Sequence, residues 1–309
     1  MKLAMIFPGQ GSQSVGMLKG YDGLPGIDAV RKEAADALGA DFLALLDDGP
    51  VEKLNLTVNT QPAMVTAGCA AYSAWLGLGG PRPEVVAGHS LGEYTALVAA
   101  EALVFRDCLP LVRFRAQAMQ EAVPEGQGAM AAILGMDASR VQKACAEAGG
   151  VVEAVNFNSP EQTVIAGEKA AVERAMERCK AGGAKRALPL PVSAPFHSSL
   201  MKPAGEKLKA YLDKVALVPP KISLVNNVDV ESHSDPAAVK SALVRQAYSP
   251  VRWVEIIERM VKEGATHIVE CGPGKALVGM TKRIDAHVKS FSLADRGALE
   301  QALAAIKGG

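Results

Sequence analysis

The feature that most constrains the fold is a serine set between two glycines, where an apolar segment gives way to a helical pattern. The stretch PEVVAGHSLGEYTALV covers residues 83–98 and contains the pattern GxSxG around Ser90. Apolar side chains then recur at helical spacing, at Leu91, Tyr94 and Val98. In such a strand–turn–helix unit the glycines let neighbouring backbone approach, and the serine hydroxyl stands at the carboxyl edge of a parallel sheet. The sequence therefore predicts an α/β fold with a nucleophilic serine.

The rest of the chain shows two kinds of pattern. Residues 1–125 and 197–309 alternate short apolar segments with amphipathic helical ones, which is typical of βα units around a parallel sheet. We therefore predict a large, discontinuous α/β-hydrolase-like domain there. Residues 126–196 follow the order βαββαβ, which is typical of a ferredoxin-like fold, and we expect them to form a small inserted domain. Its strands are predicted at 128–135, 151–157, 162–167 and 184–193, and its helices at 137–150 and 168–183.

Composition limits the classes of partner. The 309 residues include 33 basic and 33 acidic side chains, so no net field attracts nucleic acid or an anionic membrane. The first apolar segment, LAMIF, is too short for a signal peptide, and no apolar stretch is long enough to cross a bilayer. The five cysteines include no CxxC pair, which favours reduced thiols over disulfides or a zinc site. We expect a soluble cytoplasmic protein without metal or cofactor, and a monomer, since no apolar surface stripe is left unused.

A catalytic serine needs a base, and the chain has five histidines. His197 lies in the loop APFHSS, after a predicted strand and at the junction of the two predicted domains, which suits a base. His89 adjoins the serine, but successive residues of a turn point in different directions, so its ring is expected to pack against the site or orient it. The other three histidines are expected to be structural or exposed: His233, His267 and His287. His197 is therefore the favoured base.

Two further groups follow from the patterns around the serine. The backbone N–H of Leu91, at the start of the predicted helix, is placed to hold an oxyanion. A helix predicted from residue 105 to 119 carries an apolar stripe, flanked by Arg113 on one edge and Arg115 on the other. Periodicity does not choose between the two arginines, because either stem can lie along the apolar surface while its head reaches water.

Five motifs of the chain resemble those of one enzyme family. They are FPGQGSQ at 7–13, GHSLGEY at 88–94, RAQAMQ at 115–120, PFHSSLM at 195–201 and GPGKAL at 272–277. In this order they resemble the malonyl-CoA:acyl carrier protein transacylase family, the acyltransferases of bacterial type II fatty acid synthesis. They are also similar to the acyltransferase domains of polyketide synthases. The resemblance runs from Phe7 to about Arg283, and it implies the inserted ferredoxin-like domain as well.

The resemblance implies a role for each matching residue. Ser90 would carry the malonyl group as an ester, and His197 would transfer the protons. The backbone N–H groups of Gln10 and Leu91 would form the oxyanion hole. The sequence shows no evident triad acid, and the backbone carbonyl of Gln246 would orient His197 instead.

The resemblance also implies how the substrates are selected. It favours Arg115 over Arg113 as the guanidinium that binds the malonyl carboxylate bidentately. In related acyltransferases a Phe before the histidine accompanies malonyl selection, so Phe196 would fill the space that an α-methyl group needs. The expected partners are malonyl-CoA and holo acyl carrier protein. A carrier protein is usually acidic, and the basic candidates for its docking surface are Lys180, Lys185, Arg186, Lys275, Lys282 and Arg283.

Other functions would use the same residues. A serine hydrolase or thioesterase has the same type of nucleophile, but the missing triad acid and the Arg115 clamp argue against it. A malonyl transferase that serves malonate decarboxylase or a polyketide pathway would need the same site. A carrier-docking protein without activity is a third alternative, against which the intact set of Ser90, His197, Arg115 and Gln10 argues.

Overall fold

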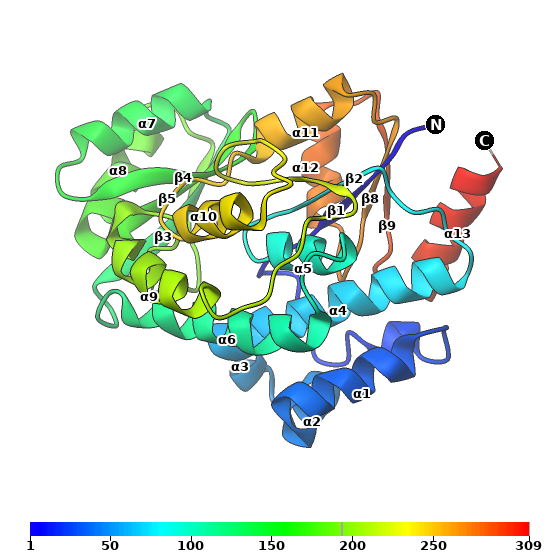
Figure 1. Cartoon of the computed structure of the whole chain (residues 1–309). Helices are drawn as coiled ribbons and strands as arrows, with labels where there is room; N and C mark the ends of the chain where they lie inside the picture. Colours follow the sequence, from blue (N-terminus) through cyan, green and yellow to red (C-terminus); the bar gives the residue numbers. More distant parts are fainter. Residues whose placement is uncertain (193, 309) are drawn as a thin grey trace.

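The computed structural model describes residues 1–192 and 194–308, and these contain two β-sheets with helices around both (Figure 1). Within the described residues, the larger sheet has five strands and the smaller has four. In Figure 1 the smaller sheet lies on the left, with helices α7 (Ala138–Glu147) and α8 (Lys169–Ala181) beside it. The larger sheet lies toward the right, where both chain termini are also found.

The five-stranded sheet is parallel throughout and has the strand order β7-β2-β1-β8-β9. Its strands are β1 (Leu3–Phe7), β2 (Val85–Gly88), β7 (Ser223–Val225), β8 (His267–Glu270) and β9 (Lys289–Ser292). The register pairs Phe7 with Gly88, so β1 and β2 end at the same level. The segments that follow these strands therefore meet at one carboxyl edge, which is where open α/β sheets place their ligands.

Alternate side chains of β1 enter two separate cores, because successive residues of a strand point to opposite faces. Leu3, Met5 and Phe7 belong to one core, and Ala4 and Ile6 belong to the other. The first core includes helices α1 (Ile27–Leu38), α2 (Ala40–Asp48), α4 (Thr57–Gly77), α5 (Gly92–Ala99), α6 (Phe105–Glu121) and α13 (Arg296–Lys307). The second includes α11 (Trp253–Lys262) and α12 (Ala276–Ile284). Burial on both faces explains why these strands are continuous apolar segments.

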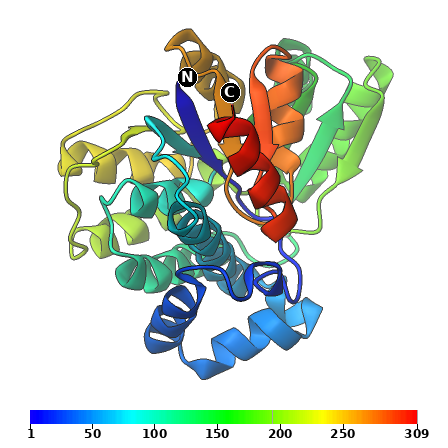
Figure 2. The same ribbon diagram turned by 90° about the vertical axis from the view of Figure 1, so that its right-hand side faces the viewer.

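Between β1 and β2 the described chain forms helices and no strand. Besides α1, α2 and α4, this segment contains the 3₁₀ helix Lys19–Tyr21 and the short α3 (Val51–Leu54). Figure 2 shows α1 and α2 below the sheet. The βα alternation predicted over residues 1–125 is therefore wrong in this part. The apolar residues of α4 show no helical period because neighbouring elements surround the helix and bury most of its residues.

The four-stranded sheet is antiparallel and has the order β4-β5-β3-β6. Its strands are β3 (Gly128–Leu134), β4 (Val152–Ser159), β5 (Gln162–Glu168) and β6 (Arg186–Pro189). Helices α7 and α8 cover one face, and the end of α6, α9 (Lys202–Leu212) and the segment after β6 cover the other. Strand β6 is shorter than the strand predicted at 184–193, and the last residue of that prediction, Ser193, lies outside the described residues.

Backbone hydrogen bonds join the antiparallel sheet to the segment that precedes α11. The N–H of Val251, just before α11, donates to the carbonyl of Val155 at 2.8 Å. The N–H of Phe157 donates to the carbonyl of Val251 at 3.0 Å. Val251 therefore lies along β4, at the edge of the antiparallel sheet and beside an irregularity in its register. Main-chain contacts, as well as side chains, thus fix this sheet to the segment that leads into α11.

The remaining helices are the 3₁₀ turn Ser199–Met201 and α10 (Pro236–Gln246). Asp137 caps α7 as its sequence position predicts, because its side chain accepts the N–H of Arg140 at 3.0 Å. The five cysteines are all buried free thiols. None of the described helices combines the length and the apolar character that a membrane span requires.

Candidate active site

Ser90 lies in a sharp turn between β2 and α5, at the carboxyl edge of the parallel sheet. Its φ is 51°, in the left-handed region that non-glycine residues rarely adopt. A Cβ on Gly88 would lie 1.8 Å from the backbone carbon of Gly92, and one on Gly92 would lie 2.0 Å from the carbonyl oxygen of Phe7. Close backbone packing therefore requires both glycines of the GxSxG pattern.

His197 lies beside Ser90, although 107 positions separate them in the chain. Its Nε2 is 2.6 Å from Ser90 Oγ, and its Nδ1 is 2.8 Å from the backbone carbonyl of Gln246. A carbonyl oxygen only accepts hydrogen bonds, so Nδ1 carries the proton and Nε2 is left to accept the hydroxyl of Ser90. This tautomer is the one that a general base for Ser90 needs.

The environment of His197 keeps its ring neutral. Burial, and then the positive charge of Arg115, lower the pKa of His197 to about 3. No carboxylate hydrogen-bonds to His197 within the described chain. The ring is therefore in a form that could accept the proton of Ser90 at neutral pH, and the described residues give this pair no acidic third member.

Arg115 reaches the same serine from α6. Its Nη2 donates to Ser90 Oγ at 3.2 Å and to the side-chain oxygen of Gln246 at 2.9 Å. Its Nη1 donates to the side-chain oxygen of Gln61 at 3.0 Å. The guanidinium is thus held by neutral amide oxygens, and its charge has no hydrogen-bonded carboxylate among the described residues.

The two arginines that the helical pattern left equivalent have different surroundings. Arg115 is 1% exposed, and its guanidinium lies 5.3 Å from the centroid of the Tyr94 ring. Burial lowers its pKa, and its Nε has no hydrogen-bond acceptor among the described residues. Arg113 is half-buried over the ring of Phe42. Arg115 is therefore the one with a buried charge and an unpaired donor, which together favour binding of an anion.

Two backbone N–H groups near Ser90 have no acceptor among the residues that the structure describes. Gln10 follows β1, and Leu91 precedes the first residue of α5. None of the hydrogen bonds among the described residues uses the N–H of either one. The side chain of Gln10 accepts a hydrogen bond from Gln61 at 3.3 Å, which helps to fix this loop. Both N–H groups are therefore available to an oxyanion.

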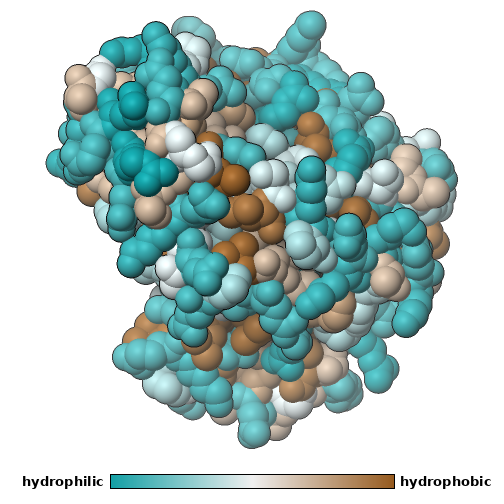
Figure 3. Space-filling view, turned by 90° about the vertical axis from the view of Figure 1, so that its left-hand side faces the viewer, coloured by the Kyte–Doolittle hydropathy of each residue, from teal (hydrophilic) through white to brown (hydrophobic). Residues whose placement is uncertain are grey.

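A cavity of about 130 Å³ lies over Ser90, and the two parts of the molecule line it together. The loops beside the parallel sheet contribute four of the lining residues: Gln10, His89, Ser90 and His197. The side of the molecule that carries the antiparallel sheet shows a band of apolar residues across its middle (Figure 3). Residues from that sheet and the segment after it complete the lining of the cavity: Met130, Asn156, Leu190, Val192 and Phe196.

His89 and Phe196 both lie at the wall of the cavity. The Nε2 of His89 lies 2.7 Å from the side-chain oxygen of Asn158, and its ring lies 5.3 Å from that of Trp253. Burial lowers the pKa of His89, so its ring is neutral and packs at the cavity wall. Phe196 is 9% exposed and lines the cavity directly before the base.

Sequence analysis missed a buried polar cluster behind Ser90. Glu93 is 1% exposed and accepts hydrogen bonds from the backbone of Asn227 and the side chain of Gln246, both at 2.9 Å. Burial raises the pKa of Glu93 to about 7. Two signals could have found these residues. Glu93 is the one acidic residue in the GHSLGEY motif, and Asn227 follows a strand that ends at the same sheet edge.

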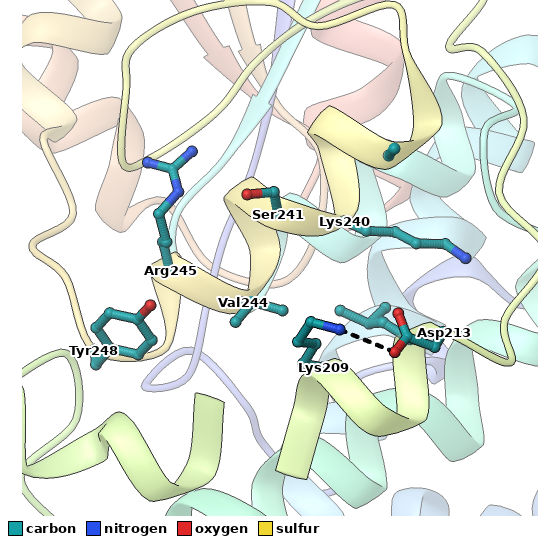
Figure 4. Close-up of a pocket in the computed structure, with 9 residues that line it drawn as sticks. Lys209, Asp213, Lys240, Ser241, Val244, Arg245 and Tyr248 are labelled. Atoms are coloured by element: carbon teal, nitrogen blue, oxygen red, sulfur yellow. Dashed lines mark hydrogen bonds and ion pairs between the residues drawn. The ribbon is translucent and has the colours of Figure 1, made fainter. Parts of the chain in front are cut away.

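A second, larger cavity of about 380 Å³ lies between α9 and α10 (Figure 4). Of the two lysines that line it, Lys209 and Lys240, the first is paired with Asp213 at 3.1 Å. Ser241 provides a hydroxyl there, but no histidine is among the described residues that line this cavity. The arrangement therefore lacks the base found at Ser90. The described residues also contain no group of three side chains suited to hold a metal ion.

The sequence matches known acyltransferases over nearly its whole length. Residues 4–292 match the family described as the acyl transferase domain. The malonyl CoA-acyl carrier protein transacylase of Escherichia coli is 52% identical over 305 residues, which cover 98% of this chain and 99% of that protein.

Solved structures show the same similarity. The acyl-carrier-protein S-malonyltransferase of Burkholderia pseudomallei is 62% identical with a TM-score of 0.96, over 98% of this chain and 99% of that one. A malonyl-transacylase in complex with a type II polyketide synthase acyl-carrier protein is 48% identical with a TM-score of 0.96, again over 98% and 99% of the two chains. Given this agreement over the whole chain, the protein belongs to the acyl transferase domain family and, within it, to the malonyl-CoA:acyl carrier protein transacylases.

Proposed function

We propose that this protein transfers the malonyl group of malonyl-CoA to the phosphopantetheine thiol of holo acyl carrier protein, in fatty acid synthesis, through an ester on Ser90. The observation that carries the proposal is that Ser90 Oγ lies 2.6 Å from a histidine base and 3.2 Å from a buried guanidinium. The first contact activates a nucleophile, and the second favours an acyl group that carries its own carboxylate. The names of two similar proteins, the Escherichia coli transacylase and the malonyl-transacylase in complex with an acyl-carrier protein, support the same donor and acceptor.

In the first half-reaction, Ser90 Oγ attacks the thioester carbonyl carbon of malonyl-CoA, and His197 Nε2 takes the hydroxyl proton. The resulting oxyanion accepts hydrogen bonds from the N–H groups of Gln10 and Leu91. The C–S bond then breaks, and His197 gives its proton to the leaving sulfur. CoA leaves as the thiol, and the malonyl group remains as an ester on Ser90.

In the second half-reaction, the phosphopantetheine thiol of the carrier gives its proton to His197 and attacks the ester carbonyl carbon. The bond from that carbon to Ser90 Oγ breaks, and His197 returns the proton to the serine. The carbonyl of Gln246 accepts a hydrogen bond from the Nδ1–H of His197 throughout, so the ring keeps one orientation during both proton transfers at Nε2. The mechanism is therefore ping-pong, with the malonyl-serine ester between its halves.

Arg115 would hold the malonyl carboxylate during both steps. The carboxylate supplies the acceptor that its buried Nε lacks. An acetyl group would leave that donor unpaired and the charge without a counter-ion. Such a loss costs roughly 3 kcal/mol or more, on the order of a hundredfold to a thousandfold in selectivity. Phe196 would exclude a methylmalonyl group, because its ring takes up space in a cavity of only about 130 Å³.

We also propose that residues 126–196 form a ferredoxin-like domain inserted into a large α/β-hydrolase-like domain made of residues 1–125 and 197–309. The element order β3-α7-β4-β5-α8-β6 and the sheet order β4-β5-β3-β6 support this division. Both helices pack on one face of the sheet, as in that fold. The role of the inserted domain would be to supply the second wall of the cavity.

The basic residues of α12 are the strongest candidates for carrier docking. A Cβ on Gly274 would lie 3.0 Å from Ser12, so the start of this helix is close to the loop that bears Gln10. The candidates on α12 and just before it are Lys275, Lys282 and Arg283. Lys180 and Lys185, in contrast, form ion pairs with acidic neighbours. We further propose a cytoplasmic monomer, in which the buried cysteines stay reduced.

The test is the mass of the intact protein after brief exposure to malonyl-CoA, with acetyl-CoA and methylmalonyl-CoA in parallel and Ser90→Ala as the control. We expect a malonyl adduct on the wild type, none on the variant, and discharge of the adduct onto added holo carrier protein. An adduct that decays in water before any acceptor is added would instead indicate a hydrolase. No adduct from any thioester would contradict the proposed function and the site.

A further inference from the structure

We infer that Glu93 is a positioning residue for Ser90, because one oxygen of its carboxylate binds the two residues whose side chains hold the backbone N–H and C=O of Ser90. The transfer mechanism above assigns no part to Glu93. The inference rests on the proposed function, since the placement of Ser90 affects the rate only if Ser90 is the nucleophile.

Two donors from distant parts of the chain meet on one atom. The backbone N–H of Asn227, 134 positions from Glu93, donates to its Oε2 at 2.9 Å. The side-chain Nε2 of Gln246, 153 positions away, donates to the same Oε2 at 2.9 Å. Glu93 itself lies in the first turn of α5 and is 1% exposed. This carboxylate therefore connects the segment after β7, the end of α10 and the start of α5.

Both of these partners also hold the backbone of Ser90. The side-chain oxygen of Asn227 accepts the N–H of Ser90 at 2.7 Å, and its nitrogen donates to the carbonyl of Gly88 at 2.6 Å. The Nε2 of Gln246 donates to the carbonyl of Ser90 at 3.0 Å. The left-handed backbone conformation of Ser90 is unfavourable for a residue with a side chain and persists only where its surroundings hold it. These hydrogen bonds do so.

Glu93 also determines which way the amide of Gln246 faces. In the structure Nε2 faces Glu93, and Oε1 accepts from Arg115 Nη2 at 2.9 Å. The inverted amide would place an oxygen against Glu93 Oε2 and a donor against Arg115, so both contacts would be lost. The backbone carbonyl of Gln246 holds His197 at the same time. Through Gln246, Glu93 therefore acts on the guanidinium and the base as well as on the serine.

The positioning of Ser90 depends on the hydrogen bonds of Glu93 and not on its charge. Oε2 can accept both hydrogen bonds whether or not the carboxyl group is protonated, and the side-chain oxygen of a glutamine can accept them too. E93Q therefore keeps the length and the acceptor but removes the charge. E93D keeps the charge but is one methylene shorter, so its oxygen cannot reach both donors. The two variants form a matched pair.

The experiment measures kcat and KM for malonyl transfer in the wild type, E93Q and E93D, together with their thermal melting. A second readout is the rate at which a sulfonyl fluoride modifies Ser90, followed by intact mass with Ser90→Ala as the blank. We expect E93D to lower kcat and the sulfonylation rate by about 10- to 100-fold. Loss of the hydrogen bonds to Oε2 lets Ser90 move, and a small displacement of a reacting group reduces the rate by about this factor. We expect KM to change less than about threefold and E93Q to lose only a few-fold.

The inference is overturned if E93D reacts like the wild type in both assays, or if E93Q loses more activity than E93D. A merely structural role would lower melting temperature and activity together, without the split between kcat and KM and without rescue by glutamine. The sulfonyl fluoride needs no acyl substrate. If the wild type takes no malonyl group, the proposed function fails, while the order of sulfonylation rates still decides the role of Glu93.

Discussion

The two walls of the cavity over Ser90 are built by different means. On the wall from the parallel sheet, polar groups lie at the ends of strands and in the segments after them, and hydrogen bonds fix nearly all of them. On the wall from the antiparallel sheet, the lining is mainly apolar: Met130, Leu190, Val192 and Phe196. The polar wall carries hydrogen-bond donors and acceptors whose directions matter. The apolar wall limits the size and shape of the group that the cavity can hold.

In the proposed mechanism the polar wall carries out the reaction, and the apolar wall determines which acyl group fits. Hydrogen bonds lose strength steeply when their geometry changes, so the polar wall tolerates little substitution. Apolar contacts are less directional, so the other wall can be reshaped at smaller cost. We therefore expect substitutions on the polar wall to change the rate by orders of magnitude, and those on the apolar wall to change which acyl group is accepted.

The largest effect is expected from removal of the base. His197→Ala leaves Ser90 without a proton acceptor, and we predict a fall in kcat of at least about 1000-fold. The measurement is the single-turnover rate of malonyl-serine formation, with melting temperature as the folding control. A rate within tenfold of the wild type, in a folded variant, would remove His197 from the mechanism.

The second effect tests the guanidinium on the polar wall. Arg115→Gln should lower kcat/KM for malonyl-CoA by about 1000-fold, while that for acetyl-CoA falls much less, because only malonate loses a charged partner. Arg113→Gln is the matched control, since Arg113 lies two residues away on the same helix, half-buried over Phe42. If both substitutions lower kcat/KM equally for malonyl-CoA and for acetyl-CoA, Arg115 does not select the carboxylate.

A smaller effect is expected on the apolar wall. Phe196→Ser removes a ring next to the base and opens room for an α-methyl group. We predict that kcat/KM for methylmalonyl-CoA rises about 10-fold, a change of the size that one methyl group contributes in an apolar pocket. The malonyl rate serves as the reference within the same protein. An unchanged methylmalonyl rate would show that another part of the wall excludes the methyl group.

A few-fold effect is expected outside both walls. Lys275→Glu and Lys282→Glu should raise KM for an acidic carrier about 3- to 10-fold and weaken the dependence of that KM on salt. Transfer of malonate to a small thiol, which needs no docking, is the control reaction. Lys180→Glu, on α8 in an ion pair with Glu177, is the matched variant and should leave the carrier's KM near its original value.

The smallest effect concerns pH. Since the pKa of His197 is lowered to about 3, the ring stays neutral as the pH falls from 7 to about 5.5. A histidine at its ordinary pKa would lose about tenfold in neutral form over this range, whereas we predict less than a twofold change in malonyl-serine formation. In the unfolded chain His197 takes up its proton near its ordinary pKa, so its contribution to stability is present above that pKa and is lost as the pH falls toward 3.

Much of the reacting side of the site could be predicted from the sequence, because local rules govern it. The GxSxG turn follows from sterics at two glycines, and the helical pattern after it identifies the strand-to-helix junction. The acceptor of the His197 ring could not come from such rules. Gln246 is 49 positions away from His197, and it acts through its carbonyl, a group that every residue has. The role of the Gln246 carbonyl was predicted only from the resemblance to a family.

The parts that sequence analysis missed are those in which tertiary contacts decide. Glu93 and Asn227 are ordinary polar residues until α5 and the segment after β7 meet. Helix α4 lacks an amphipathic pattern because protein surrounds it, so periodicity failed over the segment between β1 and β2. Periodicity could not separate Arg113 from Arg115 either, since the two flank the same stripe and differ only in what packs over them.

The main-chain hydrogen bonds between Val251 and β4 have a consequence for engineering. They join β4 of the antiparallel sheet to the segment before α11, which packs in the core beside the parallel sheet. A chimera that exchanges residues 126–196 alone keeps Val251, and the donor residues at positions 155 and 157 bring the same backbone groups, so this tie depends on the path of the donor's backbone and not on its side chains. The graft should therefore keep the irregular register of β4 over residues 154–159, so that the foreign strand meets Val251 with its backbone in the original place.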